Sequence, residues 1–110
     1  NAGGTLQGGG HVSLANAGLG NAGGTVLGAS VDIDTRLASL DNAGGTIVST
    51  RGALGVNSGA LNNAGGLLQS AQGMRLDTHG QALVNTDAGI TGGILSGDTL
   101  ALNSGSLSNR

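Results

Sequence analysis

The sequence predicts an all-β protein, a parallel β-helix (β-solenoid) of about five coils with 20–24 residues each. Two repeating patterns indicate this fold. The segment Asn-Ala-Gly-Gly starts at Asn1, Asn21, Asn42 and Asn63, so its copies lie 20, 21 and 21 residues apart. A Leu-x-Asn pattern recurs five times, with spacings of 21, 21, 22 and 24 residues. No stretch has a helical apolar period long enough for a helix, and a fixed period of this length is typical of solenoids.

Three short apolar patches in each repeat predict three strands per coil. The first patch follows the Gly-Gly step, at Leu6, Val26 with Leu27, Ile47 and Leu68. In the last repeat, either Ile90 or Ile94 takes this place. The second patch is an alternating pair, at Val12/Leu14, Val31/Ile33, Leu54/Val56, Met74/Leu76 and Leu100/Leu102. The third patch is the Leu of Leu-x-Asn. Period-two alternation between turn residues predicts strands with one buried face.

Stacked coils place equivalent residues one above another, about 4.7–4.9 Å apart. We therefore expect columns of inward aliphatic side chains, with five or six aliphatics buried in each coil. Intervening residues such as Asp32, Gly55, Arg75 and Ala101 would point outward.

The Asn of Leu-x-Asn has the same parity as the inward Leu, so it is expected to point inward at the end of its strand. A buried amide without partners costs a few kcal/mol. Stacked amides remove most of that cost, because each donates to one neighbour and accepts from the other. The predicted structural ladder consists of Asn21, Asn42, Asn63, Asn85 and Asn109. The following Ala-Gly-Gly supplies a positive φ for a corner.

The composition excludes several other classes of protein. The 110 residues include 24 Gly but no Pro, Cys, Trp, Tyr or Phe, so an ordinary globular core is not expected. Four scattered Arg form no basic patch, and no Phe, Tyr or Trp is present to stack on a base, so nucleic acid is not an expected partner. No apolar run reaches 18 residues, and we expect no membrane insertion.

The repeats extend over residues 1–110 as a single β-helical array. Neither end of this array shows a capping helix or a charged final turn, so we expect it to be uncapped at both ends. One coil buries too little apolar surface to be stable alone, and stability belongs to the stack. We interpret the chain as a fragment of a longer array.

The segment from Leu40 to Ile47, Leu-Asp-Asn-Ala-Gly-Gly-Thr-Ile, resembles the repeat signature of filamentous-haemagglutinin-type exoproteins. Residues 61–66 repeat its first half, Leu-Asn-Asn-Ala-Gly-Gly. The resemblance covers essentially the whole chain and weakens after Asp77. There, residues 86–89 read Thr-Asp-Ala-Gly, and the next Gly-Gly comes late, at Gly92-Gly93. We expect a bulge or longer loop near residues 78–93.

This family comprises very large bacterial proteins exported by two-partner secretion, including adhesins and carriers of contact-dependent growth-inhibition toxins. The resemblance implies a right-handed β-helical shaft, secreted or held at the bacterial cell surface. It implies an outer-membrane two-partner secretion transporter as a partner of the parent protein, and receptors or glycans on host or neighbouring cells. The expected function is a structural and adhesive rod segment that extends adhesive or toxin modules away from the cell.

Two alternatives remain open. The first is a fragment of a β-helical polysaccharide-degrading enzyme, and the second is a glycan-binding or ice-binding β-solenoid. For the enzyme, Asp32 and Asp34 lie on the outward face of one strand, Asn57 and Asp77 would continue the Asp34 column, and Arg75 is the nearest base. Glycosidases need two carboxylates at a fixed separation, which six dispersed Asp do not indicate. For the binding face, the column of Thr5, Thr25 and Thr46 is interrupted by Leu67.

The remaining polar motifs match known sites poorly. The run from Gly92 to Leu100 is superficially similar to a calcium-binding nonapeptide, but its Gly is displaced and no second copy follows. His11 and His79 fall in different coils. With no Lys there is no phosphate loop, and the Ser residues lie in no nucleophile elbow. We therefore expect no enzyme activity, no catalytic or metal site and no cofactor.

Overall fold

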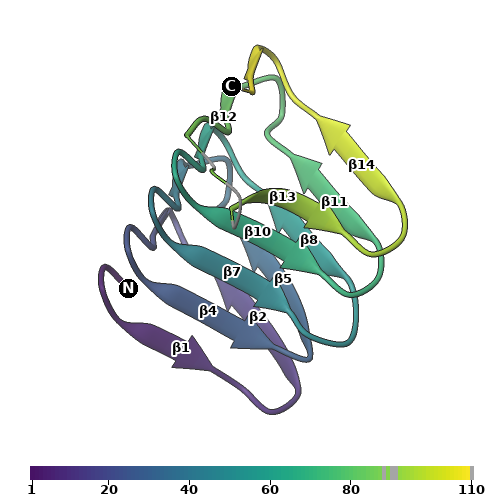
Figure 1. The fold of residues 1–110 in the computed structure, drawn as a ribbon. Helices are drawn as coiled ribbons and strands as arrows, with labels where there is room; N and C mark the ends of the chain where they lie inside the picture. Colours follow the sequence, from purple (N-terminus) through teal and green to yellow (C-terminus); the bar gives the residue numbers. More distant parts are fainter. Residues whose placement is uncertain (88, 90–91, 110) are drawn as a thin grey trace.

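The chain winds into a stack of coils, each made of three strands (Figure 1). The computed structural model describes residues 1–87, 89 and 92–109. Every regular element over these residues is a β-strand, and the strands form three five-stranded parallel sheets. The predicted all-β solenoid of about five coils is confirmed. Across the same residues, no helix is long and apolar enough to cross a membrane.

The three strands of each coil belong to three different sheets. The first sheet contains β1 (Thr5–Gln7), β4 (Thr25–Gly28), β7 (Thr46–Ser49), β10 (Leu67–Ser70) and β13 (Gly93–Ser96). The second contains β2 (His11–Ala15), β5 (Ser30–Asp34), β8 (Leu54–Asn57), β11 (Met74–Asp77) and β14 (Leu100–Asn103). The third contains β3 (Leu19–Gly20), β6 (Leu40–Asp41), β9 (Leu61–Asn62), β12 (Leu83–Val84) and β15 (Leu107–Ser108).

The register of the strands follows the sequence repeats. In the second sheet, Val31 pairs with Leu54, which pairs with Met74. In the third sheet, Leu40 pairs with Leu61, which pairs with Leu83. Each strand thus lies directly above its copy in the preceding coil, as the repeat period predicts.

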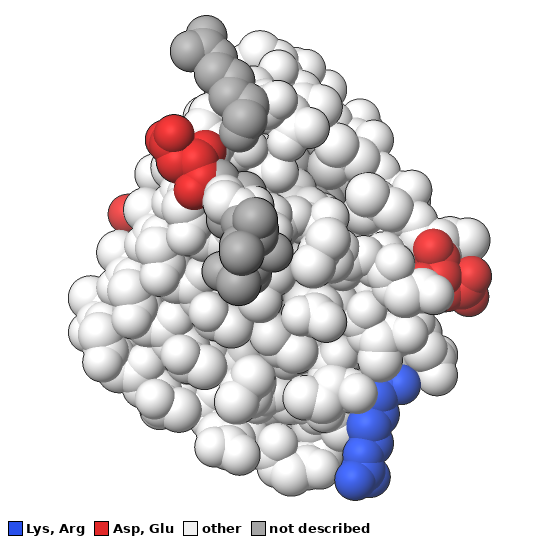
Figure 2. Space-filling view, viewed as in Figure 1, with Lys and Arg blue, Asp and Glu red and all other residues white. Residues whose placement is uncertain are grey.

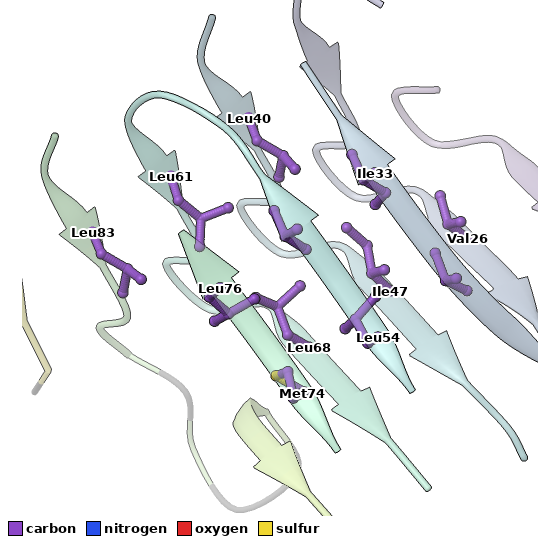
Figure 3. Close-up of a cluster of buried hydrophobic side chains, with 12 residues drawn as sticks. Val26, Ile33, Leu40, Ile47, Leu54, Leu61, Leu68, Met74, Leu76 and Leu83 are labelled. Atoms are coloured by element: carbon purple, nitrogen blue, oxygen red, sulfur yellow. The ribbon is translucent and has the colours of Figure 1, made fainter. Parts of the chain in front are cut away.

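Aliphatic side chains from all three sheets meet inside the stack (Figure 3). In the three central coils, twelve of these side chains are at most 3% exposed. Each coil contributes four of them, for example Ile47, Leu54, Val56 and Leu61 in the third coil. The expectation of five or six was wrong, because Leu27 and Val48 have outward parity on the first sheet and are only half-buried.

Small and polar residues occupy the inward positions that aliphatics leave. Where the first sheet ends, Gly28, Ser49 and Ser70 stack in register and are buried. Ser49 Oγ donates to the carbonyl of Ala29 at 3.0 Å, and Ser70 Oγ donates to that of Gln72 at 2.8 Å. Each hydroxyl therefore has a backbone carbonyl of the adjacent corner as its hydrogen-bond acceptor, and this bond offsets the cost of burying the hydroxyl.

The corner formed by each Asn-Ala-Gly-Gly segment needs its two glycines for different reasons. The first one, for example Gly44, has φ +63°, as predicted from the need for a left-handed residue. The second one, Gly45, has no such φ but lies against the Asn column. A Cβ at Gly45 would stand 2.6 Å from Asn42 Oδ1 and would collide with the carbonyl oxygen of Asn21.

The corner that leads from the fourth coil to the fifth is longer than the other corners of its kind. Gly93 follows Asn85 by eight positions, whereas its register partner Leu67 follows Asn63 by four. The predicted longer loop thus follows β12. Ile94 is the residue that stacks on Leu68 and continues the inward column. Its rival for this place, Ile90, lies outside the described residues.

Candidate functional site

The five predicted ladder residues lie in one column inside the stack. The first four donate from Nδ2 to Oδ1 of the Asn in the next coil, and Asn109, exposed at the end of the column, only accepts. The Nδ2···Oδ1 distances are 2.7 Å for Asn21 to Asn42, 2.7 Å for Asn42 to Asn63, 2.9 Å for Asn63 to Asn85, and 2.8 Å for Asn85 to Asn109. Asn1 begins this column, donating to Asn21 at 2.7 Å. Asn1 was not among the predicted ladder residues, because these were identified from the Leu-x-Asn pattern and Asn1 belongs to the Asn-Ala-Gly-Gly pattern alone.

The three fully buried amides of the ladder have complete hydrogen bonding. Asn21, Asn42 and Asn63 are fully buried, and the second proton of each Nδ2 is directed at backbone carbonyls, as in Asn42 to Gly45 at 3.3 Å and to Leu67 at 3.2 Å. No buried side-chain nitrogen or oxygen lacks a partner among the described residues. The ladder therefore joins neighbouring coils without leaving any of these amides unsatisfied.

The outer face of the second sheet carries the acidic residues that the sequence singled out. Asp32 pairs with Gly55, which pairs with Arg75, so the acid and the base stand two coils apart in one column. Asp34 pairs with Asn57, which pairs with Asp77, as the sequence predicts. Because Gly55 lacks a side chain, two adjoining hollows of about 490 and 350 Å³ open around it, and Asp32 and Arg75 line both.

Two of these carboxylates have a structural role that the sequence analysis did not anticipate. Asp34 Oδ1 accepts the backbone N–H of Arg36 at 2.9 Å, and Asp77 Oδ1 accepts that of His79 at 2.8 Å. Both close the turn that leads from the second sheet to the third. Such local bonds are the ordinary reason for Asp in turns. In both cases the Asp is the last residue of its strand and a Thr follows it, and this Asp-Thr pair is the signal in the sequence for the turn.

The two histidines lie in different coils: His11 begins β2 in the first coil, and His79 follows β11 in the fourth. His11 Nδ1 lies 2.6 Å from Ser30 Oγ at the start of the second sheet. His79 Nδ1 lies 3.0 Å from the carbonyl oxygen of Ser58, and its Nε2 lies 3.8 Å from Asp77 Oδ2. Within residues 1–87, 89 and 92–109, no three acidic, His or Cys side chains cluster in a way that could hold a metal ion.

The nonapeptide-like run from Gly92 to Leu100 is built into the coil. Its Ile94 and Leu95 belong to β13, and the N–H of Gly97 donates to the carbonyl of Ser70 at 3.0 Å. Asp98 is exposed, and its N–H donates to Ser96 Oγ at 3.4 Å. These residues thus form a strand of the fifth coil and the corner that follows it.

The face of the first sheet is of another kind. Figure 2 shows charged side chains only at the margins of the side on which this sheet lies. Its outward positions carry Leu27, Val48, Leu67 and Leu95, interspersed with the uncharged polar residues Thr5, Gln7, Thr25, Thr46 and Gln69. Leu95 is 50% exposed. The outer face of the first sheet can therefore make apolar contacts. The outer face of the second sheet presents hydrogen-bonding side chains and charges of both signs.

Comparison with models of known families, with curated proteins and with solved structures finds no significant match to this chain. The functional argument therefore depends on the residues and on the geometry above.

We expect millimolar Ca²⁺ to leave the melting temperature unchanged, because Asp34 and Asp77 already accept backbone N–H groups in their turns. A ligand present at a hundredfold excess over its Kd would add about 2.7 kcal/mol of stability. Thermal unfolding followed by circular dichroism, with and without Ca²⁺, measures the effect. A reproducible rise that Asp34→Asn abolishes would establish a site on this face. Cleavage of acidic polysaccharides is likewise not expected.

Proposed function

We propose that the chain is a rod segment of a large secreted bacterial surface exoprotein of the filamentous-haemagglutinin type. The observation that carries the proposal is the uniformity of the coils. The same four inward positions and the same Asn recur in each coil, and the register continues even past the longer corner after Asn85, so the stack can be lengthened without a change of register. A structure that grows by identical steps is suited to hold other modules at a distance.

The repeat signature at residues 40–47 supports the rest of the proposal. In this account the parent protein leaves the cell through an outer-membrane two-partner secretion transporter. The shaft then carries an adhesive or toxic module toward a host or neighbouring cell. The outer faces of the first and second sheets supply weak contacts with glycans or receptors on those cells.

The rod function is tested by measuring length against copy number. Joining residue 108 of one copy to Asn1 of the next restores Leu-Ser-Asn-Ala-Gly-Gly, the pattern that begins each corner. Small-angle scattering of one, two and four joined copies should show a longest dimension that rises linearly. The expected step is about 24 Å per copy, at about 4.8 Å per coil. Growth with the square root of copy number would indicate a flexible spacer and contradict the rod.

The location is tested separately. An antibody raised against this chain should label intact, unpermeabilised cells of the source bacterium. Labelling only after lysis would contradict export.

A further inference from the structure

We propose that the hollow around Gly55, on the outer face of the second sheet, binds one uncharged pyranose residue of a glycan. The inference rests on the surface contacts of the proposed function and deepens them, because it names the binding residues and the class of ligand. The centre of the hollow lies across β5, β8 and β11, each of which pairs with a strand on both sides.

Gly55 is the residue that keeps the hollow open. It occupies an outward position between Asp32 of the preceding coil and Arg75 of the next coil. Its φ lies outside the left-handed region, so the backbone does not require a glycine at this position. A glycine in the interior of a strand weakens the sheet, and it often marks a place where a ligand comes close to the backbone.

The residues on either side of Gly55 supply opposite hydrogen-bonding roles. Asp32 Oδ1 leans over Gly55, since a Cβ at Gly55 would stand 2.9 Å from it. Arg75 lies two coils from Asp32, with about 9.6 Å between the two backbones. These two side chains form no ion pair with each other, because the ion pair found in the described part of the chain joins His79 to Asp77. A ligand between them can donate to Asp32 and accept from Arg75.

Asn57 and His79 line the hollow beyond Gly55 along the strand. Asn57 comes two residues after Gly55 on the same face, and its amide can both donate and accept. The ring of His79 is held in place, because its Nδ1 lies 3.0 Å from the carbonyl oxygen of Ser58. This side of the hollow therefore adds further polar groups within reach of the same ligand.

The other side of the hollow is lined by small residues. Ala53, Gly73 and Ala101 leave a shallow surface there that is poor in polar side chains. A sugar ring has hydroxyl groups at its rim and C–H groups on its faces. Each hydroxyl both donates and accepts, so the ring can bond to the polar side while its C–H face packs on the small residues.

Two other classes of ligand fit the hollow less well. An anion would meet the carboxylates of Asp32 and Asp77 beside the single guanidinium of Arg75. A peptide that binds to a sheet adds a strand at an unpaired edge, and the strands that form this hollow are paired on both sides. An uncharged ring that is bound through side chains avoids both difficulties.

NMR titration of the 110-residue chain with four neutral oligosaccharides tests the proposal. The probes are maltotriose, cellotriose, a linear mannotriose and lactose. We expect at least one of them to bind with a millimolar Kd and to shift the backbone N–H signals of Gly55 and Arg75. Because the ligand is uncharged, the Kd should be the same at low and at high salt. Absence of binding by all four would overturn the proposal, as would shifts confined to another face.

Trigalacturonate and a tripeptide with blocked ends are the competing probes, and both should bind more weakly than the best neutral sugar. Tighter binding of trigalacturonate, weakened by added salt, would assign the hollow to an anion held by Arg75 and overturn the proposal. Tighter binding of the tripeptide would also overturn it.

Gly55→Thr separates binding from folding. The new side chain fills the hollow, and the atom that it meets is the carboxylate end of Asp32, which can turn away. A β-branched residue also suits a strand. We expect the melting temperature to stay the same or rise, and sugar binding to be lost. A lower melting temperature with unchanged binding would show that Gly55 serves the fold alone, and would overturn the proposal.

Asp32→Asn and Arg75→Gln should each raise the Kd about fivefold, because neutral hydrogen bonds replace charge-assisted ones. The matched controls are Asp98→Asn and Arg51→Gln, which remove the same charges at exposed positions outside the hollow. The controls should leave the Kd unchanged, and equal effects in the two pairs would contradict the assigned residues. Failure of sugar binding would leave the scattering measurement on joined copies unaffected, so the site and the rod are judged separately.

Discussion

Replacing Gly45 with Ala is expected to lower the free energy of unfolding by about 3 kcal/mol, at the upper end of the usual range for overpacking. The new Cβ would lie 2.6 Å from Asn42 Oδ1 and collide with the carbonyl oxygen of Asn21. Both atoms belong to the ladder corner, and the backbone atom cannot move without shifting its coil. Chemical denaturation followed by circular dichroism measures the loss.

The adjacent glycine provides the control. Gly44 has φ +63°, and a Cβ there meets no atom within 4 Å. Gly44→Ala should therefore cost only the left-handed penalty, about 1–2 kcal/mol. Equal losses at the two positions would show that backbone conformation alone decides this corner, and that the close approach of Gly45 to the ladder has no energetic weight.

Changes at Asn42 should have the other large effect. Asn42→Ala leaves Asn63 Oδ1 without its donor and Asn21 Nδ2 without its side-chain acceptor. We expect a loss of about 1–3 kcal/mol, the cost of an unsatisfied buried group. Asn42→Asp should cost more at neutral pH, about 3–5 kcal/mol, because it buries an unpaired charge against the Oδ1 of Asn63.

The Asp variant should also depend on pH in a definite direction. Burial raises the pKa of the introduced carboxyl above its unfolded value of about 3.9. The folded state then binds more protons than the unfolded state, so stability falls as pH rises from the unfolded pKa to the folded one. Acidification should therefore restore part of the stability, since the protonated carboxyl can donate to Asn63 Oδ1. Denaturation at several pH values measures this, with Asn42→Ala as the reference that carries the same other titratable groups but not the introduced carboxyl.

Asp32→Ala is the matched surface control. Its side chain is exposed on the second sheet and should change stability by no more than about 0.5 kcal/mol. A loss as large as that of Asn42→Ala would contradict the inward ladder.

The sequence was sufficient to predict the coil, the three sheets and the pairing register, because each depends on period and parity. Leu40, Leu61 and Leu83 share a column for the same reason that they share a place in the repeat. The first glycine of each corner was also predictable, because a positive φ has a known residue preference.

Other features depend on distances between coils that no single repeat reveals. The need for Gly45 arises from the Asn21 carbonyl of the preceding coil. The buried Ser49 could not be distinguished from an exposed one, since its acceptor, the Ala29 carbonyl, also belongs to the preceding coil. The turn after β5 holds Arg36 and Leu37 at φ +55° and +66°, which is unusual for such residues. Nothing in their chemistry predicts that conformation.

Hydrogen exchange of the Asn side-chain amides, followed by NMR, tests the stacked ladder most directly. The account predicts that the Nδ2 protons of Asn21, Asn42 and Asn63 exchange as slowly as the backbone of the core strands, because these residues are fully buried and hydrogen-bonded. The exposed Asn57 and Asn103 should exchange at the rate of a free amide. Rapid exchange at all five positions would contradict the ladder and the coil register that it joins.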